Sequence, residues 1–272
     1  MEFDVMEFPC QAKDSTVRTQ RSGDYVQSLD RGLSVLRSFS REHPSMTVAD
    51  VARSTELTRA TARRLLLTLL EMGYVTTDGK YFGLTPRVLD LGYAYISSLQ
   101  LSEIAQPFME NLSTQVHESV SAAVLDEAEV VYVTRVNTKR IMTISLSIGS
   151  RLPALWTSMG RVILANLERT DLDRFLENAP IDPPTSRSLA DVAALRAELA
   201  NVREQGFAVV DQELEEGLRS VAAPLRDRRG RVIAGMNVST HAGRITLREL
   251  RGDILPLLHH AADEINDRLA RC

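Results

Sequence analysis

The sequence predicts an α/β protein of the α+β class, with a small N-terminal domain and a larger C-terminal domain around a mainly antiparallel sheet. Two observations support this prediction. Residues 47–84 have the pattern of two short helices followed by a hairpin, whereas residues 102–272 contain two groups of short strand-like segments framed by helices. A chain of 272 residues is long enough for two such domains.

The N-terminal domain is expected over residues 25–85, after a flexible polar arm at residues 1–24. A first helix at about residues 28–40 has one apolar face, which we expect to be buried. This face comprises Leu29, Leu33, Leu36 and Phe39.

A helix-turn-helix pattern follows the first helix. Thr47 can cap a second helix, and Thr58 can cap a third helix that Gly73 ends. Asp78-Gly79 is a residue pair favoured in two-residue hairpin turns. A helix, a turn, a cationic helix and a hairpin form the layout of a winged helix-turn-helix that reads DNA.

The third helix is the expected DNA-reading helix. Its apolar residues share one face, while Ala60 and Arg64 point the opposite way. Arginine suits the acceptors of guanine, and a small residue allows close approach to the bases. The alternative is that the arginines form an ordinary solvated face. The predicted DNA contacts are Thr47, Thr58, Arg59, Ala60, Thr61, Arg63, Arg64, Thr68 and Lys80.

The net charge of −4 is unevenly distributed. Residues 25–85 hold eight Lys/Arg against six Asp/Glu, a balance of +2, whereas residues 86–272 hold 21 against 25, a balance of −4. Only the first segment suits phosphate, and only modestly, so we expect several subunits to bind DNA together. Two cysteines near opposite termini, no apolar run of bilayer length and no signal peptide favour a cytoplasmic protein without membrane partners.

A linker helix is expected at residues 86–101, with Pro86 in its first turn. It is apolar over much of its circumference, so it packs either on a partner subunit or on its own domain. The C-terminal domain follows at residues 102–272. Its expected strands are Ser119–Leu125, Val130–Arg135, Met142–Ile148, Phe207–Val210, Ser220–Leu225 and Val232–Val238. Its expected helices are 102–117, Ser158–Leu167, Asp171–Leu176, Leu189–Gln205 and 247–269.

Several motifs give the chain a family resemblance. They are Gly73-Tyr74-Val75, Gly149–Pro153, Thr157–Arg161, Gln212–Ser220 and Met236–Ser239. With them, residues 25–270 resemble the IclR (isocitrate lyase regulator) family of bacterial transcription factors. The residues of these motifs are most similar to those of the branch that regulates the β-ketoadipate pathway of aromatic-acid breakdown (PcaR, PcaU and PobR). The resemblance implies a GAF-like effector domain, homodimers or homotetramers, and small acids as ligands.

The residues suit a small carboxylate of the β-ketoadipate, protocatechuate or 4-hydroxybenzoate type. The start of the helix at Ser158 favours an anion, Arg151 could neutralise one, and Trp156 could form an aromatic wall. Asn237 and Ser239 alternate on one strand face. The resemblance adds Asp211, which would contact the effector through its backbone amide, and Ser220. The full predicted set is Arg151, Trp156, Ser158, Met159, Gly160, Asp211, Ser220, Asn237 and Ser239.

Simpler structural roles remain open for these residues. Ser158 could be only a helix cap, Trp156 could be core, and Asn237 and Ser239 could bond to neighbouring strands. Arg219 could stabilise the fold by pairing with the acidic cluster Glu213–Glu216.

No metal or cofactor site is predicted. Adjacent His259 and His260 point apart on a helix, and no nucleophile elbow, phosphate loop or dinucleotide fingerprint is present. We therefore expect a transcriptional regulator that binds double-stranded operator DNA, and not an enzyme. One alternative is a small-molecule-binding enzyme or sensor whose winged helix is a protein-interaction module. Another is an architectural DNA binder, for which the large acidic domain would have no purpose.

Overall fold

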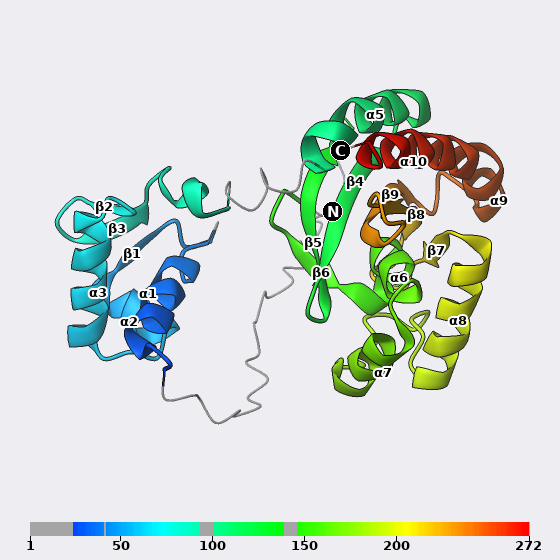
Figure 1. The fold of residues 1–272 in the computed structure, drawn as a ribbon. Helices are drawn as coiled ribbons and strands as arrows, with labels where there is room; N and C mark the ends of the chain where they lie inside the picture. Colours follow the sequence, from blue (N-terminus) through cyan, green and yellow to red (C-terminus); the bar gives the residue numbers. More distant parts are fainter. Residues whose placement is uncertain (1–23, 41, 93–100, 139–145, 272) are drawn as a thin grey trace, which may run out of the picture. The chain divides into compact units, whose positions relative to one another are not determined.

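The computed structural model describes residues 24–40, 42–92, 101–138 and 146–271, which belong to two compact units divided between residues 93 and 94 (Figure 1). The predicted arm at residues 1–24 lies almost entirely outside the described residues. The linker helix predicted at 86–101 is described only in part, and residues 88–92 are helical. Of the strand predicted at Met142–Ile148, residues 146–148 are described and form a loop rather than a strand.

Within residues 24–40 and 42–84, the N-terminal unit contains three helices and a small antiparallel sheet with strand order β1-β3-β2. The helices are α1 (Gln27–Arg37), α2 (Val48–Ser54) and α3 (Arg59–Glu71). The strands are β1 (Ser45–Thr47), β2 (Val75–Thr77) and β3 (Tyr81–Leu84). Strand β1 was not predicted, because three residues are too few to show an alternating pattern. This arrangement is the predicted winged helix-turn-helix.

The predicted buried face of α1 is partly wrong. Leu29 is 63% exposed and Leu33 is 39% exposed, whereas Val35 is fully buried and Phe39 is nearly so. Only the C-terminal end of α1 and the residues just after it join the core, so the apolar side chains of the first turns stay in solvent.

The predicted two-residue hairpin turn is also wrong. Thr77 pairs with Phe82, which leaves four residues between the paired positions. The Asp78 carboxylate accepts hydrogen bonds from the backbone N–H groups of Lys80 at 2.8 Å and Tyr81 at 2.7 Å. This side-chain capping stabilises a wider turn.

The C-terminal unit is built on a six-stranded antiparallel sheet of order β6-β5-β4-β9-β8-β7. The strands are β4 (Ser119–Asp126), β5 (Glu129–Val136), β6 (Arg151–Pro153), β7 (Ala208–Asp211), β8 (Leu218–Arg226) and β9 (Val232–His241). The helices are α5 (Leu101–Val116), α6 (Ser158–Ala165), α7 (Arg169–Asn178), α8 (Val192–Gln205), α9 (Leu247–Glu249) and α10 (Leu255–Leu269). Strand β6 was not predicted.

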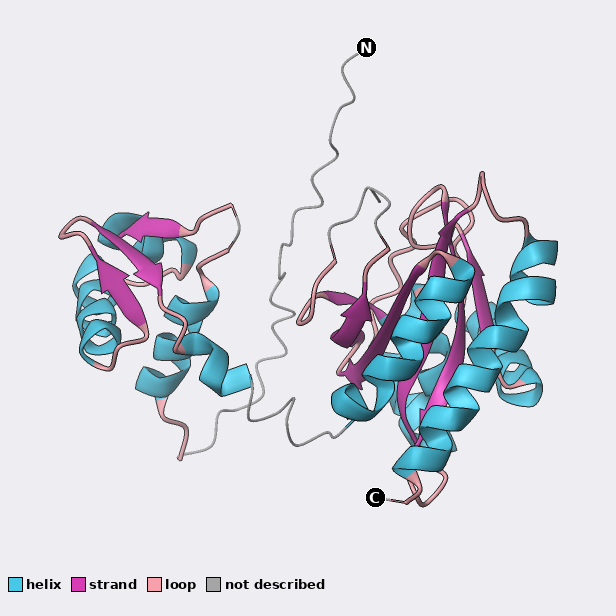
Figure 2. Cartoon of the chain, turned by 90° about the horizontal axis from the view of Figure 1, so that it is seen from above, coloured by secondary structure: helices cyan, strands magenta, loops and turns pink. Residues whose placement is uncertain are grey.

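Helices cover both faces of this sheet (Figures 1 and 2), and each face carries a separate apolar core. Helices α5 and α10 lie side by side and pack on one face, and α6, backed by α8, packs on the other. Gly235 of β9 permits the close approach of α6, because a Cβ at this position would lie 2.8 Å from the Met159 carbonyl oxygen.

The predicted C-terminal helix at 247–269 is interrupted. A π-helical turn at Leu250–Ile254 separates α9 from α10. Pro256 lies in the first turn of α10 and has no N–H to continue the α-helical hydrogen bonds, which accounts for the local change. Within the described residues, no helix is both long and apolar enough to cross a membrane.

Candidate functional site

Helix α3 presents a cationic face to solvent. Arg59, Arg63 and Arg64 are exposed, and no ion pair to them is found within residues 24–40 and 42–92. The opposite face of α3 buries Ala62 and Leu66 in the domain core. Three unpaired guanidinium groups on one exposed face can contact phosphates and base edges.

The predicted threonine contacts differ in their availability. Thr58 is exposed and caps α3, because its Oγ1 accepts from the Thr61 backbone N–H at 3.2 Å. Thr47 is half-buried, and its hydroxyl is bound within the capping box with Asp50. Thr61 is half-buried and Thr68 is exposed.

Two smaller features complete the predicted DNA face. Ala60 is exposed in the first turn of α3. Lys80 is exposed in the hairpin turn, with its Nζ 5.0 Å from the centre of the Tyr81 ring.

The C-terminal unit contains a pocket on the α6 side of its sheet. Apolar and aromatic side chains form most of its wall, together with one cation and several neutral polar groups. The pocket is lined by Tyr132, Arg135, Leu146, Leu152, Trp156, Thr157, Val210, Leu214, Leu218, Ser220, Asn237 and Ser239. Four residues of the predicted effector set, Trp156, Ser220, Asn237 and Ser239, are therefore brought together here.

Arg151 does not line this pocket. It is exposed and pairs with Glu129 at 2.6 Å and with Asp126 at 2.8 Å. Its side chain thus already has two carboxylate partners at the surface.

The predicted helix start at Ser158, Met159 and Gly160 is completely buried and does not line the pocket. Glycine at position 160 lets another part of the protein, rather than a ligand, lie close to its backbone. The Ala154 carbonyl group occupies the space where a Cβ would lie. The packing of the preceding turn on α6 therefore explains this glycine without a ligand.

Asp211 also lies outside the pocket lining, at the end of β7. Its carboxylate accepts a hydrogen bond from Arg219 Nε at 2.7 Å. Burial alone would raise the pKa of Asp211, but the hydrogen bond and charge of Arg219 outweigh it and lower that pKa. Arg219 thus pairs with Asp211 rather than with the acidic residues at 213–216.

Arg135 is a pocket residue that sequence reasoning missed. Its Nη1 donates to Ser121 Oγ at 2.8 Å, and its Nε donates to Asn137 Oδ1 at 2.6 Å. Both acceptors are neutral, and the described residues offer Arg135 no carboxylate. Burial lowers the pKa of Arg135, which indicates that its charge lacks compensation.

A β-bulge explains why the sequence pattern hides Arg135. Side chains on a regular strand alternate between faces, so Tyr132 and Arg135 should lie on opposite faces. The register between β4 and β5 shifts at Ala122/Ala123, and both side chains therefore reach the pocket. Burial raises the pKa of Tyr132 to about 12, so its hydroxyl stays neutral at physiological pH.

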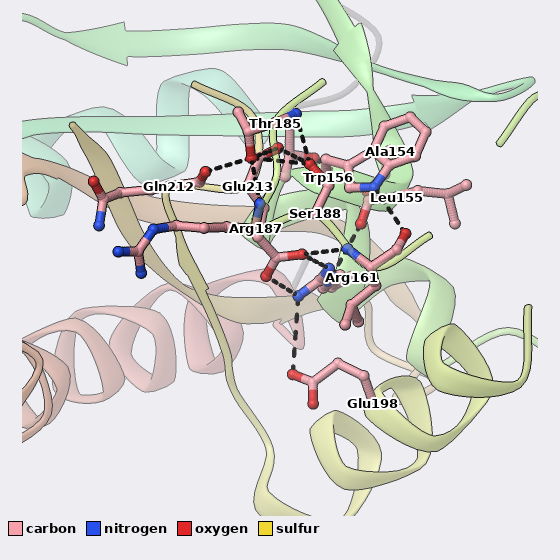
Figure 3. A network of polar contacts seen from close by, with 12 residues as sticks. Ala154, Leu155, Trp156, Arg161, Thr185, Arg187, Ser188, Glu198, Gln212 and Glu213 are labelled. Atoms are coloured by element: carbon pink, nitrogen blue, oxygen red, sulfur yellow. Dashed lines mark hydrogen bonds and ion pairs between the residues drawn. The ribbon is translucent and has the colours of Figure 1, made fainter. Parts of the chain in front are cut away.

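A buried ion pair supports two walls of the pocket (Figure 3). Arg161 of α6 is 2% exposed, and its guanidinium donates to both carboxylate oxygens of Glu213, at 2.8 and 2.5 Å. Glu213 also accepts from the Leu189 backbone N–H at 3.3 Å, and the Leu189 carbonyl accepts from Trp156 Nε1 at 3.4 Å. The network thus anchors Trp156, which lines the pocket, and Glu213, whose chain neighbour Leu214 also lines it.

One polar atom of the pocket wall lacks a partner. Asn237 is 4% exposed and donates from Nδ2 to Ser239 Oγ at 3.0 Å, but its Oδ1 accepts no hydrogen bond from the described residues. Ser158 Oγ and Thr240 Oγ1 are also unpaired, but neither residue lines the pocket. Buried acceptors in proteins normally have a donor, so Asn237 Oδ1 is a position where a ligand donor could bind.

Comparison with known proteins matches both units to one family. Residues 28–79 match the IclR helix-turn-helix domain, and residues 93–267 match the C-terminal domain of the bacterial transcriptional regulator IclR. The Pca regulon regulatory protein of Pseudomonas putida is 44% identical over 247 residues, which cover 90% of this chain and 85% of that protein.

Two solved structures add to this comparison. A Rhodococcus sp. RHA1 protein described as a transcriptional regulator has a TM-score of 0.83 at 52% identity, covering 91% of this chain and 99% of that chain. A double mutant of the Acinetobacter PobR inducer-binding domain, in complex with 3-hydroxybenzoic acid, has a TM-score of 0.58 at 30% identity, covering 61% of this chain and 98% of that chain. This chain belongs to the IclR family of bacterial transcriptional regulators.

Proposed function

We propose that this regulator binds operator DNA through α3 and its wing, and that a small organic acid from aromatic-acid breakdown changes its affinity for that DNA. The pocket beneath α6 is the proposed acid site. The observation that carries the proposal is the pocket's composition, with aromatic and apolar walls and Arg135 as a cation that has no carboxylate partner among the described residues. An apolar pocket with a few directed polar groups suits a small aromatic acid.

The relatives support this choice of ligand. The names of the Pseudomonas and Acinetobacter proteins refer to the Pca regulon and to an inducer domain with bound 3-hydroxybenzoic acid. For this chain, acids of the β-ketoadipate, protocatechuate and 4-hydroxybenzoate types are the proposed effectors.

On the DNA side, we propose Arg64 and Ala60 as base contacts and Arg59, Arg63, Thr58 and Lys80 as phosphate contacts. Their exposure supports these roles. Thr61 and Thr68 flank the same face, and the half-buried Thr47 would contribute from the half-buried start of α2. Arg64 extends from the face opposite the buried leucines, which is the geometry of a major-groove reader.

We further propose that the protein acts as a homodimer or homotetramer. The first two turns of α1 leave Leu29 and Leu33 exposed, and a charge balance of only +2 over residues 25–85 favours combined binding by two copies. Two reading helices would then contact successive major grooves of a pseudo-palindromic operator.

The test has two steps. A thermal-shift screen of benzoate, 3- and 4-hydroxybenzoate, protocatechuate and β-ketoadipate identifies ligands, and fluorescence anisotropy then measures binding to the DNA upstream of the protein's own gene. The proposal predicts saturable DNA binding that at least one stabilising acid changes. An effector must bind one DNA-binding state better than the other, so an acid that binds without changing DNA affinity would contradict the switch. Failure to bind any upstream DNA would favour a protein-interaction role for the winged helix.

A further inference from the structure

We infer that Arg87 and Thr85 fasten the chain that leaves the N-terminal unit to the C-terminal end of α3, so that a change in this chain is passed to the reading helix. Arg87 is thus a positioning residue for DNA reading and does not itself contact DNA. This inference rests on the proposed acid switch and names a contact through which the switch acts on α3.

The C-terminal end of α3 has no cation of its own. The helix has no basic residue in its last turn and ends at Glu71. The chain then turns at Gly73, whose φ is +80° and whose N–H donates to the Leu70 carbonyl oxygen at 3.0 Å. This end of a helix carries partial negative charge and is stabilised by a nearby cation. A cation that stabilises it therefore comes from another part of the chain.

Arg87 lies over this end of α3. Its guanidinium carbon is 5.6 Å from the centre of the Tyr74 ring. A Cβ at Gly73 would lie 3.2 Å from Arg87 Nη1 and 3.7 Å from its Cδ, so the arginine covers the backbone of this glycine. Among the described residues, no carboxylate pairs with Arg87. Its charge is therefore directed at the aromatic face and at the negative end of the helix.

Thr85 adds two hydrogen bonds at the same place. Its Oγ1 donates to the Gly73 carbonyl oxygen at 2.6 Å, and its backbone N–H donates to the Tyr74 carbonyl oxygen at 2.9 Å. The next helix begins on this residue, because the Val88 N–H donates to the Thr85 carbonyl oxygen at 3.2 Å. Thr85, Arg87 and the first turn of that helix therefore form one hydrogen-bonded attachment to the end of α3.

This attachment lies on the covalent connection between the two units. The units divide between residues 93 and 94, and the residues that line the proposed acid site all belong to the C-terminal unit. Helix α3 has 13 residues, so it is about 20 Å long, and a tilt of about 5° at its C-terminal end moves its first residue by about 2 Å. Such a shift exceeds the range of hydrogen-bond lengths, so it breaks base contacts made by the first turn.

The exposure of Arg87 limits the size of its effect. A cation over an aromatic ring at an exposed site corresponds to about two- to fivefold in an equilibrium constant. A ligand can act through a contact only by the difference in that contact between the two states. Arg87 therefore contributes at most about two- to fivefold to the acid-induced change in operator affinity. It lies outside the core of the N-terminal unit, so its loss leaves that core intact.

Fluorescence anisotropy on the full-length protein tests this contact. Operator affinity is measured without acid and with 4-hydroxybenzoate, protocatechuate or β-ketoadipate at saturation, and calorimetry measures acid binding without DNA. Arg87→Gln should bind each acid as wild type does and should bind the operator within about threefold of wild type when no acid is present. Its acid-induced change in operator affinity should be about two- to fivefold smaller.

Further variants separate the contact from general packing. Tyr74→Phe keeps the aromatic ring and should keep the wild-type response, whereas Tyr74→Leu should lose as much of it as Arg87→Gln. The Arg87→Gln/Tyr74→Leu double variant should lose no more than either single variant, because both remove one contact. Arg53→Gln is the matched control, since this arginine of the same unit is 78% exposed, pairs with Asp50 and should leave the response unchanged.

The outcomes separate this inference from the function on which it rests. An equal acid-induced change in wild type and Arg87→Gln would overturn the inference and leave the acid switch intact. A loss of acid-free operator affinity of about tenfold with an unchanged acid-induced change would make Arg87 a DNA contact, and would also overturn it. Absence of any acid-induced change in wild type would overturn both the inference and the switch. Arg87→Gln decides the question even if the Tyr74 variants do not fold.

Discussion

The buried pair of Arg161 and Glu213 allows the sharpest stability prediction. Glu213→Gln keeps the side-chain shape but removes the negative charge, which leaves the guanidinium of Arg161 buried at 2% exposure, with Glu198 at 4.0 Å as its remaining carboxylate partner among the described residues. Loss of one member of a buried pair costs about 3–5 kcal/mol. The amide oxygen retains one acceptor for Arg161, so we expect a loss near the lower limit, about 3 kcal/mol.

Urea denaturation of the full-length protein, followed by circular dichroism, measures this loss for the C-terminal unit. In a thermal scan followed in the same way, the melting temperature should fall by on the order of 10 °C for a unit of this size. The control is Arg151→Gln, which breaks a pair whose side chains are both 41% exposed and should cost less than about 1 kcal/mol.

A double variant distinguishes loss of the ion pair from general disruption of packing. Arg161→Met with Glu213→Leu removes both charges, so it should cost less than Glu213→Gln alone. If Glu213→Gln cost no more than Arg151→Gln, the pair would not organise this part of the pocket and the reasoning would be wrong.

Three further predictions concern other parts of the molecule. Thr58→Ala removes the cap of α3 and should destabilise the N-terminal unit by about 1 kcal/mol in thermal denaturation, whereas Thr68→Ala, whose hydroxyl bonds only the Arg64 carbonyl, should cost nothing. Arg64→Ala should weaken operator binding by about 1–3 kcal/mol in a mobility-shift titration, and an unchanged affinity would exclude it as a base contact. The pKa of Asp211 is lower in the folded protein than in the unfolded chain, where it is about 4. The ionised carboxylate therefore stabilises the fold fully above the unfolded pKa, and this stabilisation is lost as the pH falls through the folded pKa. Asp211→Asn should therefore reduce the free energy of unfolding at neutral pH, and its difference from wild type should shrink toward about pH 3; a constant difference would contradict the assignment.

The sequence predicted features that depend on local patterns. The cap at Thr58, the helix that follows it and the alternating strands β4, β5, β8 and β9 appear near their expected positions. It also located Asn237 and Ser239, because their alternation along one strand fixes them on one face.

The missed features depend on tertiary contacts. Arg151 and Arg135 have similar local sequence signals, and only the sheet register shows that one pairs with surface carboxylates while the other reaches the pocket. Gly160 is explained by contact with the Ala154 carbonyl group, which local sequence cannot show. The exposure of Leu29 depends on how much of α1 reaches the core, since its spacing alone is that of a buried residue.

In the proposed switch, an acid bound at Arg135 changes DNA binding by α3. The most direct measurement is operator affinity, by fluorescence anisotropy, with and without saturating hydroxybenzoate for wild type, Arg135→Gln and Arg151→Gln. The acid should change the operator affinity of wild type and of Arg151→Gln. Arg135→Gln should bind the operator as wild type does without acid and should not respond to the ligand. An equal response in Arg135→Gln, or no response in wild type at saturation, would contradict this switch.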